Sequence, residues 1–178
     1  MTVTLRFLKP LASLLAVLLL TTGCVTTGLP LASASPWAPV PLDTSSNPLD
    51  VAFTDANHGF LVGSNRLVME SNDGGASWEN RSLELPEEEN FRLISIDFRG
   101  DEGWIAGQPG LLMHSTDAGQ HWSRLLLDNK LPGEPFLITA TAAQTAELAT
   151  DVGAVYRSSD GGKSWQAEMG DAAGAVRD

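Results

Sequence analysis

The residues with the most regular chemical spacing in this sequence are three aspartates, each held in the same short string. The string reads Ser-x-Asp-x-Gly-x-x-Trp, and its members are Ser71, Asp73, Gly75 and Trp78; Ser115, Asp117, Gly119 and Trp122; and Ser158, Asp160, Gly162 and Trp165. A carboxylate at such a turn can accept backbone N–H groups, and calcium binding is the alternative. A calcium loop of the EF type needs oxygen ligands at alternate positions and a distal Glu, but Gly, Ala and Trp occupy those places here. The pattern therefore favours turn capping and predicts neither a metal site nor a cofactor.

Other polar side chains give weaker signals of catalysis. His58, His114 and His121 lack the spacing of a zinc site, although His114 and His121 could approach each other across one hairpin. We expect surface or half-buried imidazoles. The repeated string also occurs in sialidases, which use a Tyr nucleophile, and the only Tyr is Tyr156, beside one of the strings. A carbohydrate-active enzyme of the cell envelope therefore stays open as an alternative function.

The charge balance bears on the class of partner. The chain has 22 acidic and 11 basic side chains, with a formal net charge of −11 at pH 7. An acidic protein repels a polyanion, so the composition argues against nucleic-acid binding. It favours a basic partner, or a locally basic patch on an acidic body. We interpret Arg66, Arg81 and Arg124 as scattered surface charges.

The N-terminal residues have the layout of an export signal. Arg6 and Lys9 precede an apolar run at 11–20, and small residues follow it. A basic head, an apolar run and small residues are typical of a secretory signal. The run is about half the ~20 residues that a membrane-spanning helix requires, so we predict a signal and not a span.

The only cysteine lies where such a signal would be cut. The string Leu-Thr-Thr-Gly-Cys at 20–24 resembles a bacterial lipoprotein box. The resemblance implies that Cys24 becomes the lipid-bearing N-terminus, and cleavage nearby without lipid is the alternative. We expect a signal peptide over 1–23 and a lipid-anchored flexible tether over 24–36, which is small-residue-rich and uncharged.

The elements that position the aspartates repeat with them. The serines of the three strings are spaced 44 and 43 residues apart, and each repeat contains four short apolar or alternating runs, which predict four strands. In the second repeat the strands are expected near 92–98, 103–107, 110–115 and 121–127. The string, known as the Asp-box, would form the turn between the third and fourth strands. Its Trp would begin the fourth strand and be buried between repeats.

Four strands in each repeat are the pattern of a propeller blade. We therefore predict an all-β fold with about three four-stranded antiparallel blades over 37–178. Residues 37–43 look like a lone fourth strand, and residues 173–178 look like the first strand of another repeat. Three blades with loose strands at both ends leave a ring open, so we expect the N-terminal part of a longer protein.

Four longer strings indicate a family. Residues 90–107, 131–140, 146–150 and 153–157 resemble the photosystem II stability/assembly factor of cyanobacteria and chloroplasts, and the likeness covers roughly 37–178. The resemblance implies a seven-bladed propeller on the lumenal side of the thylakoid membrane. It implies an assembly factor, not an enzyme, that binds the precursor of the D1 reaction-centre subunit and early assembly complexes.

The same resemblance implies a patch of arginines on one face for partner binding. We assign this patch to Arg92, Arg157 and Arg177. Arg92 opens the second repeat, and Arg177 lies in the matching strand of the next one. Arg157 ends a third strand. A generic lipid-anchored binding propeller outside photosynthesis is a further alternative.

Overall fold

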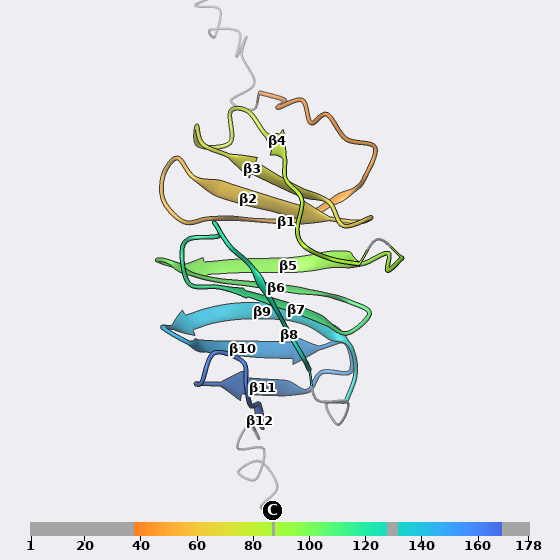
Figure 1. The fold of residues 1–178 in the computed structure, drawn as a ribbon, viewed down its shortest axis with the longest axis vertical. Coiled ribbons are helices and arrows are strands. Elements are labelled where there is room, and N and C mark those ends of the chain that lie inside the picture. The colour runs from red at the N-terminus through yellow and green to blue at the C-terminus, as the bar shows by residue number, and fades with distance from the viewer. Residues whose placement is uncertain (1–37, 87, 128–131, 169–178) are drawn as a thin grey trace, which may run out of the picture. The chain divides into compact units, whose positions relative to one another are not determined.

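The computed structural model describes residues 38–86, 88–127 and 132–168, which form three four-stranded antiparallel sheets. We call the sheets blades 1, 2 and 3. Their strands are β1 (Pro48–Phe53), β2 (Gly59–Gly63), β3 (Val68–Ser71) and β4 (Glu79–Asn80) in blade 1; β5 (Arg92–Arg99), β6 (Glu102–Gln108), β7 (Leu111–Ser115) and β8 (Ser123–Leu125) in blade 2; and β9 (Pro135–Ala142), β10 (Thr145–Thr150), β11 (Val155–Ser158) and β12 (Gln166–Ala167) in blade 3. The sheets lie side by side in chain order (Figure 1). The predicted all-β fold is confirmed, and the expected strands of the second repeat match β5 to β8.

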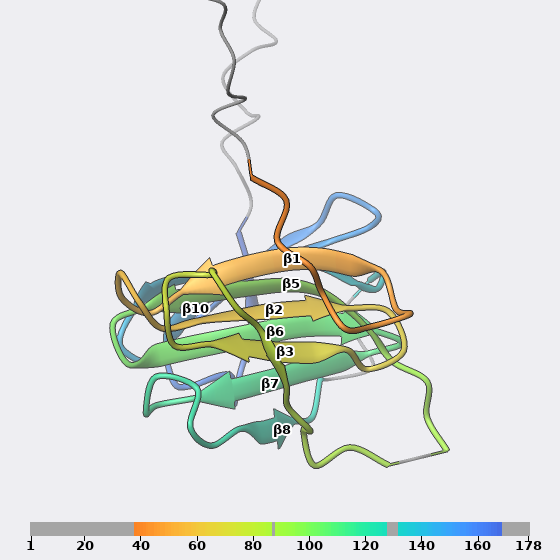
Figure 2. The same cartoon turned by 90° about the horizontal axis from the view of Figure 1, so that it is seen from above.

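Each blade is a meander whose first strand contacts the first strand of the next blade. Side chains of one blade accept backbone N–H groups of the next: Asp50 Oδ2 accepts from Ile96 at 2.9 Å, and Asp97 Oδ2 accepts from Ala140 at 2.8 Å. Figure 2 shows β1 and β5 running side by side at one edge of the blades. Each sheet ends at its own first strand, so backbone strand pairing does not connect one blade to the next. These side-chain bonds make that connection instead.

Apolar side chains fill the two seams between blades. Between blades 1 and 2 the core includes Phe60, Ile96 and Met113, and between blades 2 and 3 it includes Trp104 and Leu148. The alternation of each strand supplies one layer of side chains to each face of its sheet. The seams are therefore built as sheet-on-sheet packing.

Close packing in the first seam requires one particular glycine. Gly119 has φ +83, and a Cβ there would lie 2.5 Å from the Phe60 ring of blade 1. An L-residue at this turn would meet both a disfavoured backbone conformation and a steric clash. The Asp-box glycine thus lets blade 2 approach blade 1.

The Asp-box tryptophans are expected from the sequence to be buried between blades; all three are half-buried, and Trp122 and Trp165 do pack against the cores of the seams. Trp122 does lie against rings of both blades, with centroids 6.2 Å from Phe60 and 5.7 Å from Phe98. Trp78 instead packs on Phe53 of its own blade. Each Trp stands just before a fourth strand of only two or three residues. At that outer margin little of the sheet extends over the Trp, so the residue is only half-buried, although Nε1 of Trp122 and of Trp165 is buried.

Residues 38–47 contain no strand, so the expected lone fourth strand at 37–43 is absent over its described part, 38–43. A strand requires a hydrogen-bonded partner strand, and this segment pairs with none of the described strands. Its part from Val40 onward covers blade 1 instead: Leu42 packs beside Leu61 and Met69, and the Asn80 side-chain amide donates to Asp43 O at 3.3 Å. The predicted strand at 173–178 lies outside the described residues.

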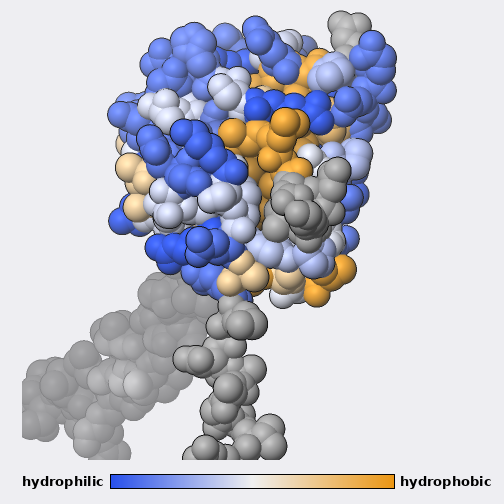
Figure 3. All heavy atoms as spheres, turned by 60° about the horizontal axis from the view of Figure 1, so that its bottom comes forward, coloured by the Kyte–Doolittle hydropathy of each residue, from blue (hydrophilic) through white to orange (hydrophobic). Residues whose placement is uncertain are grey.

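Blade 3 has exposed apolar side chains on the side away from blade 2. Leu137 is 50% exposed and Val155 is 37% exposed, whereas the alternating neighbour Ile138 is buried against blade 2. Figure 3, in which the lower end of Figure 1 comes forward, shows apolar surface among polar residues. In the two seams, an apolar face of this kind is covered by the neighbouring blade. No helix in the described part of the chain is long and apolar enough to span a membrane.

Candidate partner-binding surface

The three Asp-boxes are hydrogen-bonded turns. In the first, Asp73 Oδ1 accepts the Ser77 N–H at 2.9 Å, and Ser71 Oγ accepts the Gly75 N–H at 2.8 Å while its hydroxyl donates to Asp73. Asp117 and Asp160 accept the equivalent N–H groups at 2.9 and 3.0 Å. This is the bonding that the turn-capping interpretation predicts. The carboxylate oxygens are thus already used within the turn.

These hydrogen bonds stabilise the charged form of each carboxylate. The Ser77 hydroxyl and N–H lower the pKa of Asp73 to about 2, and those of Ser164 lower the pKa of Asp160 to about 2. For Asp117 the main causes of a pKa of about 2 are the N–H and the imidazole of His121. The repeated string therefore gives three turns in which the pKa of the Asp carboxyl is lowered, with a Ser hydroxyl as partner in two and an imidazole in one.

Each histidine pairs with a carboxylate of its own. His58 Nε2 lies 2.6 Å from Glu70, and His121 Nδ1 lies 2.7 Å from Asp117. His114 pairs with Glu102 and stacks on the Trp104 ring. Within the described ranges no group of three or more His, Cys, Asp and Glu side chains could hold a metal ion.

The residues expected to carry binding lie in different settings. Arg92 is exposed at the first residue of β5 and faces Gln108 across the sheet, at the end away from the Asp-box turn. Arg157 stands one residue before an Asp-box serine and contacts Glu147 at 3.4 Å and Glu168 at 3.5 Å. Cys24 and Arg177 lie outside the described residues. Tyr156, the nucleophile that a sialidase mechanism would require, is 6% exposed.

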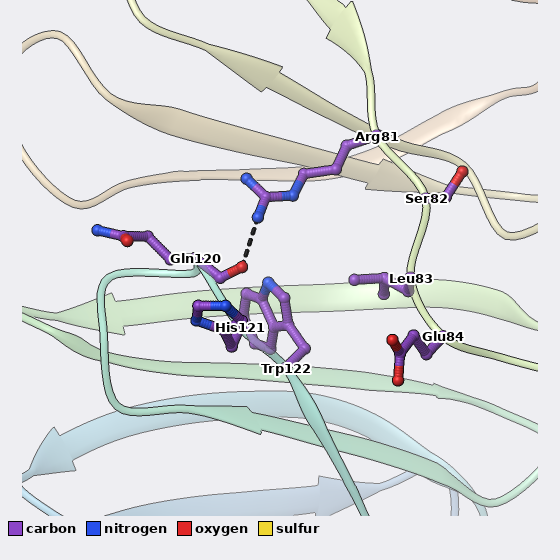
Figure 4. Close-up of a pocket in the computed structure, with 7 residues that line it drawn as sticks. All are labelled: Arg81, Ser82, Leu83, Glu84, Gln120, His121 and Trp122. Atoms are coloured by element: carbon purple, nitrogen blue, oxygen red, sulfur yellow. Dashed lines mark hydrogen bonds between the residues drawn. The ribbon is translucent and has the colours of Figure 1, made fainter.

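Two hollows lie side by side on the segment that leads from blade 1 to blade 2. The first, of about 190 Å³, is lined by Arg81, Ser82, Leu83, Glu84, Gln120, His121 and Trp122. The second, of about 250 Å³, is lined by Asn65, Arg66, Arg81, Ser82, Leu83 and Leu85. Arg81, Ser82 and Leu83 line both hollows, and we call the two together the Arg81 groove. Figure 4 shows Arg81 reaching from one side of the first hollow toward Gln120, with Trp122 on the other.

Arg81 links the two blades. One Nη donates to Glu70 at 2.5 Å, and the other donates to Gln120 O, in the Asp-box turn of blade 2, at 2.5 Å. The guanidinium also lies 5.6 Å from the centroid of the Phe60 ring. Burial raises the pKa of Glu70, but the hydrogen bonds from His58 and Arg81 outweigh it, so the pKa lies below its ordinary value.

Arg66 enters the same groove from a turn that favours glycine. It has φ 58, and its Nη1 donates to Pro86 O at 3.0 Å. The equivalent positions in the other repeats, 44 and 43 residues further along, are Gly110 and Gly153. Arg66 and Arg81 are therefore not the scattered surface charges expected from the sequence, but lie along one groove. Aligning the three repeats would have singled out Arg66, because an Arg stands where its counterparts are Gly.

Three meander sheets, each with an Asp-box turn between its third and fourth strands, define an Asp-box β-propeller. Sequence similarity assigns the chain to one family within this class. This chain belongs to the family described as "Photosynthesis system II assembly factor YCF48", whose sequence profile matches residues 29–178. The family expected from the sequence is confirmed.

Individual proteins that are similar in sequence to this chain carry the name of the same family. The chain is 69% identical over 176 residues to the "Photosystem II assembly lipoprotein Ycf48" of Parasynechococcus marenigrum (strain WH8102), covering 97% of this chain and 53% of the relative. It is 66% identical over 176 residues to the protein of the same name from Synechococcus sp. (strain CC9902), with the same shares covered. The chain thus spans about half the length of these curated relatives.

Two solved structures share the fold. One, described as "YCF48 bound to D1 peptide", has a TM-score of 0.73 and 48% identity, covering 76% of this chain and 45% of that one. The other, "YCF48 from Cyanidioschyzon merolae", has a TM-score of 0.66 and 45% identity, covering 72% of this chain and 38% of that one.

Proposed function

We propose that the full-length protein is a photosystem II assembly factor whose propeller docks the precursor of the D1 reaction-centre subunit and early assembly complexes. One observation carries the proposal: a protein 48% identical to this chain, with the same blades, is described as bound to a D1 peptide. The family profile over 29–178 supports the same assignment. The role is binding and not catalysis, in line with relatives that are named as assembly lipoproteins.

The protein acts at the lumenal side of the thylakoid membrane, held there by lipid. Residues 1–23 are removed on export, Cys24 carries the acyl chains, and 24–36 forms the tether to the blades. One acyl chain gives only marginal membrane binding, so the several chains of a lipoprotein anchor the protein stably. Mass spectrometry of the mature N-terminus tests this: an unmodified terminus beyond Cys24 would contradict it.

Arg92, Arg157 and Arg177 are proposed as contacts to acidic groups of the partner. Arg92 is exposed and forms no ion pair with the described residues, so its guanidinium has donors to offer. Arg157 already contacts two glutamates, so a partner would have to compete with them. Planar, bidentate contact with carboxylates favours Arg over Lys.

The test is co-purification of the tagged full-length protein from solubilised thylakoid membranes. The expected result is recovery of the D1 precursor with early assembly complexes. Replacing Arg92, Arg157 and Arg177 together by Gln should reduce the recovery without lowering the melting temperature. Absence of D1 precursor from the parent sample would refute the docking function. Unchanged recovery with the triple variant would remove only these three residues from the site.

A further inference from the structure

In blade 1 an arginine occupies a turn position that is glycine in blades 2 and 3. Arg66 has φ 58, while Gly110 and Gly153 occupy its place in the other repeats with φ 50 and 83. A left-handed backbone disfavours an L-residue with a long side chain and is strained. Glycine avoids that strain in blades 2 and 3. In blade 1 an arginine occupies this turn, which is the less stable residue for such a backbone.

The side chain that replaces glycine reaches a second arginine. Arg66 and Arg81 line one hollow with Asn65 and Ser82, and none of the described residues that line it is acidic. Arg81 likewise departs from the repeat, because its counterparts are Leu125 and Glu168. Two independent departures thus bring two guanidinium groups to the same groove on a chain whose net charge is −11.

Both guanidinium groups keep donors for a ligand. The hydrogen bonds of Arg66 and Arg81 to described residues use Nη1 of Arg66 and the two Nη atoms of Arg81, out of five N–H donors on each side chain. At the far side of the groove the His121 side chain is 88% exposed and pairs with Asp117 through Nδ1 only. Arg81 thus brings guanidinium donors to both hollows, Arg66 adds its own to the second, and the acidic side chain of Glu84 lines the first.

The walls between these donors suit a polypeptide. Residues 82–86 belong to neither sheet, and the half-buried side chains of Leu83, Leu85 and Trp122 contribute apolar surface. A compact inorganic anion would fill one hollow only. An extended chain with spaced carboxylates would span both and place its backbone along 82–85.

We infer that the Arg81 groove binds an extended acidic peptide segment, whose carboxylates are held by Arg66 and Arg81. This rests on the proposed docking function and names a second contact of that partner, between blades 1 and 2. The Arg66 N–H donates to Phe91 O at 2.9 Å, so the groove begins beside Arg92. Arg forms charge-assisted, bidentate hydrogen bonds with carboxylates, which favours this ligand class. The backbone strain at Arg66 is then the cost of placing a guanidinium in the groove.

The decisive variant is Arg66→Gly, which restores the residue of the other two repeats. Binding of a short fluorescent peptide of alternating Glu and Ser is measured with the full-length protein. We expect the affinity to fall about tenfold, because a charge-assisted bond is lost. The melting temperature should stay unchanged or rise by about 2 °C, because strain is relieved. A residue with a purely structural role would lower the melting temperature instead.

Two matched controls separate strain and charge from the site. Ala118 has φ 56 in an Asp-box where the other repeats have Gly74 and Gly161, so Ala118→Gly relieves comparable strain outside the groove. It should leave peptide binding unchanged. Arg99→Gln removes one exposed positive charge elsewhere and should also leave it unchanged.

Several results would overturn the inference. These are equal binding by Arg66→Gly and the parent, equal binding of a peptide with Gln in place of Glu, or a lowered melting temperature of Arg66→Gly. Arg66-dependent binding to vesicles containing phosphatidylglycerol, with none to the peptide, would assign the groove to a membrane instead. If D1 precursor co-purifies with the parent but the peptide does not bind, the docking function is supported and peptide binding in the groove is refuted. If the precursor is absent but peptide binding depends on Arg66, the groove binds peptide and the docking function is refuted.

Discussion

The two seams between blades are built from the same repeat but are filled differently at their outer margin. In the seam between blades 2 and 3, Leu125 packs with Trp104 and Trp165 in an apolar cluster. In the seam between blades 1 and 2, the equivalent residue is Arg81, which lies over Phe60 and bonds to the opposite turn. One side-chain position thus decides whether the margin is closed by apolar packing or opened into a polar groove.

A histidine–glutamate pair is present in blades 1 and 2 with its members exchanged. In blade 1, His58 precedes β2 and Glu70 lies on β3, whereas in blade 2 Glu102 lies on β6 and His114 on β7. The exchange changes what the carboxylate reaches. Glu70 holds Arg81, but Glu102 accepts the Gln144 N–H of blade 3 at 2.8 Å. At this position the second seam is therefore joined by a part-buried polar contact, and the first by the more exposed contact of Arg81 with Gln120.

The largest expected effect is at the centre of the second seam. Trp104 is 0% exposed and contacts Trp165 and His114, so Trp104→Ala should cost about 4 kcal/mol of the free energy of unfolding. Trp122→Ala removes a half-buried ring from the first seam and should cost about 2 kcal/mol. Denaturant unfolding of the full-length protein measures both. An equal or larger loss for Trp122 would show that the two seams are equally closed.

Removal of the two glutamates should follow the same order. Glu102 is 8% exposed and bonds to both His114 and Gln144, so Glu102→Ala leaves two donors without a partner and should cost about 3 kcal/mol. Glu70→Ala, at a more exposed pair, should cost about 1 kcal/mol. The same unfolding measurement applies. Similar losses for the two variants would mean that burial does not distinguish the pairs.

A smaller effect, common to all blades, is expected in acid. Asp73, Asp117 and Asp160 have pKa values of about 2 when folded, below the ordinary 3.8. Carboxylates with a lowered folded pKa contribute stability that is present above the unfolded pKa. That contribution is lost as the pH falls from about 4 through 2.

The unfolding midpoint followed against pH in this range measures the loss. Asp117→Asn serves as the control, because it removes one titrating group and should make the decline shallower. A decline of unchanged steepness in that variant would place the acid sensitivity elsewhere.

The sequence predicts the blades well because the information is local. Alternation of apolar residues and the glycines of the Asp-box determine strands and turns within each repeat. The Arg81 groove is different, because Arg81 and its acceptor Gln120 lie 39 residues apart, in two repeats. Their contact depends on how blade 1 is set against blade 2, which no pattern within one repeat specifies. The partial exposure of Trp122 has a similar origin, in the shortness of β8.

The smallest expected effect on stability comes from making the first seam resemble the second. Arg81→Leu introduces the residue found at Leu125, so the lost bonds to Glu70 and Gln120 are partly offset by apolar contact with Phe60. The net change should stay within about 1 kcal/mol, because partly exposed ion pairs contribute little. The stability of the variant should also depend less on salt, since the Arg81–Glu70 pair is screened by ions. Unfolding at low and high ionic strength measures both quantities. A loss as large as that expected for Glu102→Ala would show that Arg81 joins the blades as firmly as the buried pair does, and the contrast between an open and a closed seam would then fail.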